Sequence, residues 1–552
     1  MGDLFGKEWL LTTMTFAPVL GALVILFLPR TASAAIKWVS LAAAAVPLVC
    51  CWPLMQGFSA AKGKFTDFSF VQQLDWIPGF GIQYYVGVDG VSVTMVVLTA
   101  LISFLCVIAS WGFEHWTVNR GIKGYFALFL LLETGMMGVF VSLDFFLFYV
   151  FWEIMLLPMY FLIGIWGGPR REYAAIKFFL YTLAGSVLML IVMLAMAFTV
   201  DGDPNAPGSQ LCFNLPTLMQ NSAAFAGEHA RDWWMLAFIG LYIGFAIKIP
   251  AFPFHTWLPD AHVEAPTPIS VILAAVLLKM GTYGLIRINY SILPDAARQF
   301  APVMMFFGFV GIVYGALCAM AQIRGVPRVN PQTGEHFIER DWKKLIAYSS
   351  VSHMGFCMIG LAGCTPAGLS GCMFQMWNHG CITGMLFLLV GVVYDRAHHR
   401  NIDGFGGLWT PMPKYGALTA LAFMASLGLP GLSGFVSEVL CFVGAFQASD
   451  PAENAVWGYG ASYYRVLTAL SVTGVVFGAG YFLWSYQKVF LGPLNPKYEA
   501  IEDVTWREQL TLWPLAAIIV ALGIFPKYYL DIVGDSLKFV VNHVQMPWLK
   551  PG

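Results

Sequence analysis

Long apolar runs separated by short polar loops recur from one end of the chain to the other. Each run is about 18 to 25 residues long, and a helix of that length, at about 1.5 Å per residue, crosses a hydrocarbon core of about 30 Å. Because the bilayer core holds no water for backbone groups, such runs must be helices. The pattern predicts an all-α membrane protein with fourteen spans, centred near residues 20, 47, 101, 134, 156, 187, 243, 279, 311, 354, 384, 428, 475 and 517.

Helix-breaking residues interrupt two of these spans in mid-membrane. The seventh span contains Pro250 and Pro253, and the twelfth contains Pro430 and Gly431. Proline removes a backbone donor and clashes with the preceding turn. Membrane helices tolerate such breaks where the freed groups are buried in protein or line a cavity. The breaks therefore indicate functional sites near the membrane centre, although Pro and Gly are also generally common in membrane helices.

The spacing of the two breaks suggests an internal repeat. Five spans separate them, which predicts two five-helix units, residues 124–290 (spans four to eight) and 301–487 (spans nine to thirteen), each with its broken helix fourth. An odd number of helices inverts the second unit relative to the first. Many secondary transporters have inverted repeats of this kind, with sites beside discontinuous helices.

Composition places the whole chain in the membrane. Of its 552 residues, 58% are hydrophobic and 11% are charged, whereas soluble domains have about 25% charged residues. The longest polar stretches, residues 56–83, 201–231, 324–344 and 447–464, are loop-sized, so we expect one polytopic membrane domain over residues 1–552. The basic stretch 324–344 is expected to be a cytoplasmic loop, and a solvated linker is its simplest interpretation. A net charge of −1 without a basic tail argues against a nucleic-acid partner.

Basic residues predict the orientation of the chain. With the N-terminus outside, the inner loops hold most of the Lys and Arg, including Arg30, Arg120, Arg170 and the stretch 324–344. Positively charged loops stay on the cytoplasmic side, so we expect both termini outside. The first apolar segment lacks a basic leader and continues to Pro29, so no cleavable signal is expected.

Ionisable side chains fall inside several predicted spans. The main candidates are four charged residues and two histidines: Glu153, Lys248, Lys279, His353, His379 and Glu438. A charge at the bilayer centre costs at least about 2.5 to 3.5 kcal/mol, so buried charges are functional candidates by default. At about 1.5 Å per residue, His353 lies roughly 12 Å from one face of the membrane and His379 roughly 12 Å from the opposite face. Antiparallel neighbouring helices would bring them to similar depth.

Proton transfer needs groups that exist in both protonation states near neutral pH. Burial lowers the pKa of an ammonium group, and a nearby carboxylate raises it again, so a Glu–Lys pair can act as a switch. We expect Glu153 and Lys248 to form such a pair, with a static salt bridge as the alternative. Histidine suits a relay between lysines, although a single buried histidine is often only a satisfied core residue.

Four further residues are secondary candidates. Glu133 is a buried carboxylate of span four, and its alternative role is to bond neighbouring helices. Asp260, His262 and Glu264 lie between spans seven and eight. They are positioned either to take up protons or simply to cap helices and line the loop.

Metal and haem sites are disfavoured. The ten cysteines form no CxxC motif, and even the adjacent Cys50 and Cys51 are expected to be small core residues. Paired histidines on membrane helices can ligate haem, but no second pair lies at matching depth. Ser349, Ser350 and Ser352 instead surround His353 with groups suited to holding water.

Several motifs around these residues resemble one known family. They are FWE at 151–153, FAIKIPAFPFHTWLPDAHVEAPTPIS at 245–270, LLKMGTYGLIR at 277–287, AYSSVSHMGF at 347–356, NHG at 378–380 and GLPGLSGFVSE at 428–438. Over spans three to fourteen they look like the antiporter-like subunits of the proton-pumping NADH:quinone oxidoreductase, complex I. Glu438 in place of lysine, GVDGVS at 87–92 and a chain end soon after span fourteen favour the M-type branch, counterpart of mitochondrial NADH dehydrogenase subunit 4.

The resemblance implies roles for the candidates. Glu153 and Lys248 would be the coupling pair, Lys279 the central carrier, His353 and His379 the bridge, and Glu438 the terminal site. It also implies that NADH, FMN, Fe–S clusters and quinone bind partner subunits, with no cofactor or metal on this chain. Expected partners are other membrane subunits of complex I, especially the antiporter-like L and N subunits, in a bacterial cytoplasmic (inner) membrane with both termini periplasmic. A mitochondrial location is less favoured.

Two other classes stay open. The D-type subunit of the multisubunit sodium/proton antiporter shares these motifs, but it would require a sodium site and normally has lysine in place of Glu438. A structural scaffold predicts that the buried charges could be neutralised without loss of pumping. A scaffold has no reason to keep four costly charges at one depth, so we expect proton translocation coupled to electron transfer in other subunits.

Overall fold

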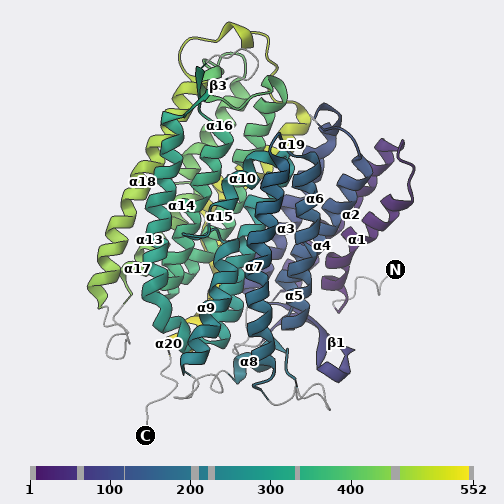
Figure 1. The fold of residues 1–552 in the computed structure, drawn as a ribbon, viewed down its shortest axis with the longest axis vertical. Helices are drawn as coiled ribbons and strands as arrows, with labels where there is room; N and C mark the ends of the chain where they lie inside the picture. The colour runs from purple at the N-terminus through teal and green to yellow at the C-terminus, as the bar shows by residue number, and fades with distance from the viewer. Residues whose placement is uncertain are drawn as a thin grey trace.

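The computed structural model describes residues 8–58, 67–116, 118–200, 211–221, 231–329, 336–448 and 460–545. Figure 1 shows long helices packed side by side, most of them running along the long axis of the molecule. Within these residues, twelve helical stretches are long and apolar enough to cross a membrane. The predicted all-α membrane fold class is confirmed.

The main helices follow one another along the chain. In chain order they are α1 (Leu10–Phe27), α2 (Ser33–Gly57), α3 (Gly90–Ala109), α4 (Ile122–Val141), α5 (Phe145–Ile154), α6 (Leu156–Trp166), α7 (Arg171–Ala197), α8 (Leu215–Gln220), α9 (Arg231–Lys248), α10 (Trp257–Glu264), α11 (Thr267–Ile272), α12 (Leu278–Gly284), α13 (Pro294–Arg324), α14 (Trp342–Ala362), α15 (Pro366–Ala397), α16 (Pro413–Ser426), α17 (Ser433–Phe446), α18 (Ala461–Phe490), α19 (Trp506–Ile524) and α20 (Lys527–Gln545).

Shorter apolar helices occupy the places of the broken seventh and twelfth spans. α9 ends at Lys248, and the chain is not helical again until α10 begins at Trp257. α16 and α17 are likewise separated by residues 427–432. The fifth span is helical from Phe145 to Trp166 apart from one irregular residue, Met155, between α5 and α6. The count of fourteen spans and the inverted repeat stay predictions.

The eighth span lies at the centre of the bundle. It runs from Thr267 to Tyr290, and its apolar stretch is completely buried inside the protein. Two π-helical segments, η4 (Leu273–Leu277) and η5 (Leu285–Tyr290), flank α12, which carries Lys279. A π-helical turn shifts the backbone hydrogen bonds and is frequent at functional sites.

Small β-hairpins lie outside the helices at opposite ends of the molecule (Figure 1). β1 (Ser69–Ile77) pairs with β2 (Ile82–Val88) through Gly81, whose φ of 68° is readily adopted by glycine. β3 (Val326–Val329) pairs with β4 (His336–Glu339). Residues 330–335 of the predicted basic loop lie outside the described residues. We call the end with β1 and β2 the hairpin end, and the end with β3 and β4 the basic end.

The chain continues beyond the last predicted span into α20, which the hydrophobic pattern did not predict. α20 is amphipathic: Val533 and Leu537 are buried, whereas Tyr528 and Lys538 are exposed. Its buried side packs against α3 and α15 near the hairpin end (Figure 1). The termini themselves, at 1–7 and 546–552, lie outside the described residues, so their predicted orientation stays a prediction.

Candidate functional site

Antiparallel packing of α14 and α15 brings the two predicted histidines together. The ring centroids of His353 and His379 are 5.7 Å apart. His379 Nδ1 lies 2.5 Å from Lys279 Nζ, and His353 Nδ1 lies 3.2 Å from Glu438 Oε1. Four predicted residues from four helices therefore form one buried row, in the order Lys279, His379, His353 and Glu438.

Close backbone approach brings Lys279 to His379. Lys279 Nζ donates a hydrogen bond of 2.6 Å to the carbonyl of Ala274 in the π-helical segment η4. On α15, Gly380 faces the same segment, and a Cβ at this position would lie 3.0 Å from the carbonyl oxygen of Ala275. A glycine after His379 is therefore needed for α15 to pack this closely, which explains the glycine of the NHG motif.

A small cavity of about 10 Å³ lies beside the row, with His353, His379 and Glu438 in its lining. Thr383 also lines it, and neither Thr383 Oγ1 nor His379 Nε2 has a hydrogen-bond partner. A polar cavity of this size has room for about one water molecule. A water here would bridge the two histidines, whose ring nitrogens make no direct hydrogen bond to each other.

Ser426 and Gln375 complete the surroundings of Glu438. Ser426 Oγ lies 3.2 Å from His353 Nε2, which leaves His353 Nδ1 to face the carboxylate. Gln375 Oε1 accepts a hydrogen bond of 2.6 Å from Ser437, the residue before Glu438. The sequence pattern did not mark these polar residues, because only the three-dimensional packing distinguishes them from ordinary polar positions in a helix.

The predicted coupling pair is not hydrogen-bonded in this structure. Lys248 is buried at the last residue of α9, and its Nζ has no hydrogen-bond partner. The ammonium group instead lies 4.9 Å from the ring centroid of Trp152 and 5.8 Å from that of Phe178. Glu153 is half-buried near the irregular residue Met155 between α5 and α6, and its Oε1 is also without a partner. Lys248 thus rests on an aromatic face, which stabilises a cation.

The secondary candidates occupy different surroundings. Glu133 is fully buried in α4, and neither carboxylate oxygen has a hydrogen-bond partner, so it does not bond a neighbouring helix. Asp260 pairs with Lys177 at 2.7 Å and with Arg170 at 3.6 Å near the protein surface. Asp260 therefore belongs to an ion-pair network, in which Arg170 also lies 3.6 Å from Glu264.

His262 and Glu264 lie near the end of α10. His262 is fully buried, stacks on Phe387 with centroids 4.6 Å apart, and has no partner for either ring nitrogen. Glu264 accepts a hydrogen bond of 2.9 Å from the backbone N–H of Arg170. Glu264 also lines a larger cavity, of about 80 Å³.

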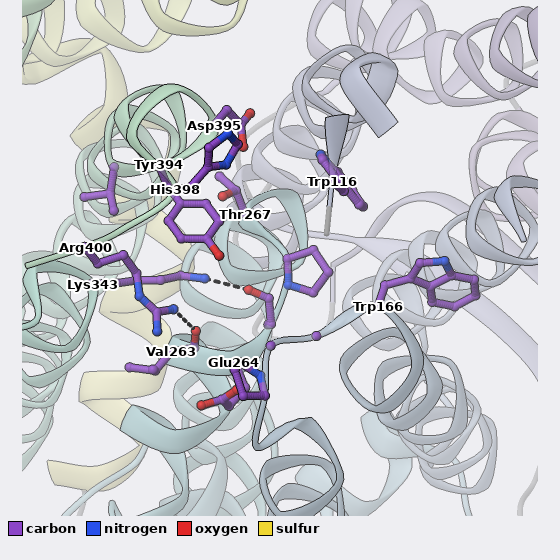
Figure 2. A pocket seen from close by; sticks show the side chains of 16 residues that line it. Trp116, Trp166, Val263, Glu264, Thr267, Lys343, Tyr394, Asp395, His398 and Arg400 are labelled. Atoms are coloured by element: carbon purple, nitrogen blue, oxygen red, sulfur yellow. Dashed lines mark hydrogen bonds between the residues drawn. The ribbon is translucent and has the colours of Figure 1, made fainter. Parts of the chain in front are cut away.

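This larger cavity lies at the basic end, lined by Lys343 at the start of α14 and by Arg400 just beyond the end of α15. Lys343 donates a hydrogen bond of 2.6 Å to the carbonyl of Ala265, and Arg400 donates to the carbonyl of Val263. Figure 2 shows these two cationic side chains on one side of the cavity and Trp166 on the other. The cavity brings polar and charged groups next to the segment that carries His262, which favours access of water from this end.

Within the described residues, no group of three or more His, Cys, Asp or Glu side chains is arranged to hold a metal ion. The ten cysteines are all free thiols. The buried row consists of groups whose side chains can bind and release protons.

Comparisons with known proteins identify the family of the chain. Residues 142–325 and 335–484 match the sequence model of the family described as NADH:quinone oxidoreductase/Mrp antiporter, TM. The NADH-quinone oxidoreductase subunit M of Rhodobacter capsulatus is 39% identical, over 97% of this chain and 96% of the relative. The subunit M of Rickettsia conorii is 38% identical, over 85% of this chain and 86% of the relative.

Solved structures show the same fold. A chain of respiratory complex I from Thermus thermophilus with bound NADH superposes with a TM-score of 0.79 at 27% identity, covering 97% of this chain and 99% of that chain. A chain of the Mrp complex from Dietzia sp. has a TM-score of 0.77 at 19% identity, covering 98% and 99%. With the family model covering more than half of its length and relatives at 38–39% identity over most of it, this chain belongs to the NADH:quinone oxidoreductase/Mrp antiporter membrane family, on the subunit M and chain 4 branch.

Proposed function

We propose that this chain is the proton-translocating M-type membrane subunit of an NADH:quinone oxidoreductase, in which protons move through buried side chains while electrons pass from NADH to quinone in other subunits. The observation that carries this proposal is the row from Lys279 to Glu438, with contacts of 2.5 Å at one end and 3.2 Å at the other. Each member is at least nine-tenths buried. Such costly groups in contact at membrane depth favour a transport role.

A proton transfer along the row conserves charge at each step. The Lys279 ammonium gives a proton to His379 Nδ1, and the proton on Nε2 leaves to a water in the 10 Å³ cavity. That water, or His353 after it, protonates the Glu438 carboxylate. Ser426 supports this order, since its contact with His353 Nε2 keeps Nδ1 directed at Glu438.

Proton uptake is best placed at the basic end. The cavity lined by Glu264 and Lys343 is adjacent to His262, whose unpartnered ring nitrogens are suited to passing protons inward. From there a proton would reach Lys279. Asp260 is placed outside this route, because its carboxylate pairs with both Lys177 and Arg170 and does not line the cavity, whereas Glu264 pairs with Arg170 alone and lines it.

Coupling to electron transfer is assigned to Glu153 and Lys248. In the present arrangement the two are not hydrogen-bonded, and Lys248 is held by Trp152. Movement of Glu153 towards Lys248 would stabilise the ammonium form, and movement away would favour release of its proton. Moving one charge against 100 mV requires about 2.3 kcal/mol, which a change of about two pKa units supplies.

The partners proposed are neighbouring membrane subunits of the same complex, in particular the antiporter-like L and N types. Glu153 is only half-buried in this chain alone, and a carboxylate at that depth would not face lipid. A protein neighbour would cover it. We assign the binding of NADH, FMN, Fe–S clusters and quinone to other subunits. We place the chain in a bacterial cytoplasmic membrane with both termini periplasmic.

A sodium/proton antiporter subunit is the second candidate, favoured by the shared fold of the Mrp complex. The relatives at 38–39% identity carry the complex I name, and Glu438 departs from the lysine expected of the antiporter. The complex I proposal is therefore preferred.

Lys279→Met tests the proposal in vesicles containing the assembled complex, with Lys538→Met as a control at an exposed position. The control should behave like wild type. We expect Lys279→Met to abolish NADH-driven proton pumping while immunoblots show normal assembly. Unchanged pumping would refute the proposal, and loss of sodium-dependent proton exchange alone would replace it with the antiporter function.

A further inference from the structure

A second line of polar groups runs from Lys279 towards the hairpin end. Tyr283 and Arg287 follow Lys279 at intervals of four residues, which places all three on one face of the eighth span. Each interval advances about 6 Å along the helix. All three are buried, with 0%, 0% and 4% of their surfaces exposed. The line starts at the central proton carrier and points away from both histidines.

Arg287 is the last residue of this line, and hydrogen bonds hold its side chain in place. Its Nη2 lies 2.5 Å from Asp89 Oδ1 and 3.0 Å from Ser92 Oγ, and its Nε donates a hydrogen bond of 3.2 Å to Tyr283 Oη. Asp89 is held in turn, because its carboxylate accepts hydrogen bonds from the backbone N–H groups of Val91 and Ser92 at the start of α3. The guanidinium therefore has one fixed position.

The cluster lies at the outer limit of the bundle. Asp89 directly follows β2, and the neighbouring Gly90 donates a backbone hydrogen bond of 3.0 Å to Ser536 of α20. The side chain of Asp89 is 10% exposed and that of Arg287 is 4% exposed. Arg287 thus lies between Tyr283 and Asp89 at the hairpin end, and its guanidinium carbon is 5.3 Å from the ring centroid of Phe68.

A guanidinium in this position cannot relay protons. Arginine stays charged in proteins and has no acceptor atom, so Arg287 can neither release a proton nor receive one. A fixed buried cation also repels protons and other cations, as arginine does in the narrow part of aquaporin-type pores. We propose that Arg287, held by Asp89 and Tyr283, is an electrostatic barrier that keeps a proton on Lys279 from escaping to the hairpin end and directs it to His379.

The proposal rests on the proposed function, because the barrier matters only if Lys279 carries protons. Its alternative is a purely structural ion pair that ties the eighth span to α3. The two explanations predict different effects when Arg287 or Asp89 is removed separately. A structural pair is lost whichever partner is removed, whereas a barrier depends on the cation and not on the carboxylate.

The test uses the full complex reconstituted in lipid vesicles, with passive proton influx measured under an imposed pH gradient and membrane potential. Arg287→Gln removes the cation, and Asp89→Asn keeps it. Arg298→Gln is the matched control, since Arg298 pairs with Asp295 at 2.6 Å at the start of α13 but does not belong to the line from Lys279. Assembly is checked by immunoblot for each variant.

We expect Arg287→Gln to raise passive influx by about tenfold or more, since a barrier lowered by only about 1.4 kcal/mol has that effect on a rate. NADH oxidation should continue while the proton gradient falls. Asp89→Asn and Arg298→Gln should stay as tight as wild type. Equal leaks in Arg287→Gln and Asp89→Asn, or no leak in Arg287→Gln, would overturn the proposal.

A variant that fails to assemble is replaced by the double substitution Asp89→Asn with Arg287→Gln, which is neutral and close in shape. The double variant lacks the cation, so its vesicles should leak protons, and vesicles that stay tight would also overturn the barrier proposal.

Lys279→Ala added to Arg287→Gln should make the vesicles tight again, because the leak runs through Lys279. If Lys279→Ala alone abolishes pumping while Arg287→Gln stays tight, the barrier fails and the proposed function stands. If Lys279→Ala alone leaves pumping intact, the proposed function fails.

Discussion

Lys279 Nζ and His379 Nδ1 lie 2.5 Å apart although the two residues are 100 positions apart in the chain. The contact joins the central span of the bundle to α15, and both residues are fully enclosed by protein. In a protein interior of low dielectric constant, a proton shared between an ammonium and an imidazole responds strongly to nearby charge. The distance between these two atoms is therefore sensitive to small changes in packing.

Gly380→Ala should weaken this contact. The new Cβ would lie 2.8 Å from Leu98 Cδ2 and 3.0 Å from the Ala275 carbonyl oxygen, so α15 must move away from η4. We expect proton pumping to fall roughly three- to tenfold, because a misplacement of about 1 Å can cost about 100-fold in a transfer step. The initial rate of NADH-driven acidification, normalised to assembled complex, measures it. Gly384→Ala, one turn further on, has its nearest atom at 3.5 Å and should behave like wild type.

Gly428→Ala should displace Glu438. Gly428 has a φ of +78°, and its new Cβ would lie 2.8 Å from Glu438 Oε2. Gly431 in the same break has a φ of +92° and no atom within 4 Å of a new Cβ. Both substitutions cost about 1–2 kcal/mol of backbone strain, so they should lower thermal stability alike. Only Gly428→Ala should reduce pumping per assembled complex, and equal pumping in the two variants would contradict a role for Glu438.

Removal of one partner of the Arg396–Glu508 pair should destabilise the basic end. Arg396 donates two hydrogen bonds of 2.8 Å to Glu508, and the two side chains are 16% and 14% exposed. Arg396→Ala leaves a carboxylate largely buried without its cation, which we expect to cost about 1–3 kcal/mol. Thermal unfolding in detergent measures the loss. Lys538→Ala, in an exposed pair with Asp535, should change stability by less than about 1 kcal/mol.

Acid should loosen the loop after α15. His399 packs on Phe405 and lies 2.5 Å from Tyr498 Oη, and burial, followed by the nearby Lys497 charge, lowers the pKa of its imidazole. The unfolded imidazole has a pKa of about 6.5. Below that pH the unfolded chain binds a proton that the folded loop excludes. Stability therefore falls as the pH drops from about 6.5 towards the lower pKa of His399 in the folded protein.

Hydrogen exchange at residues 398–405 between pH 7 and 5 measures this loss of stability. His399→Gln should remove the pH dependence, and an unchanged acid response in that variant would show that another group is responsible.

The hydrophobic pattern was sufficient for the fold class and for most of the candidate site. A bilayer requires helices of a certain length, and it penalises every charge inside them. Lys279, Glu438 and the breaks at Pro250 and Pro430 therefore stand out in the printed sequence. Motif resemblance added expected roles for these residues, which stay predictions, and the family comparison confirms the family.

Tertiary structure decided which of these groups touch. Lys279 meets His379 rather than another base, because Gly380 allows close packing on a π-helical segment that no local pattern marks. Lys248 lies on Trp152 and not against Glu153. The Asp89–Arg287 pair joins residues 198 positions apart, and α20 and both β-hairpins have no apolar run long enough to be recognised as spans. The sequence shows which charged groups are costly to bury. Only long-range packing fixes the distances between them, and these distances underlie the proposed relay at Lys279 and the proposed barrier at Arg287.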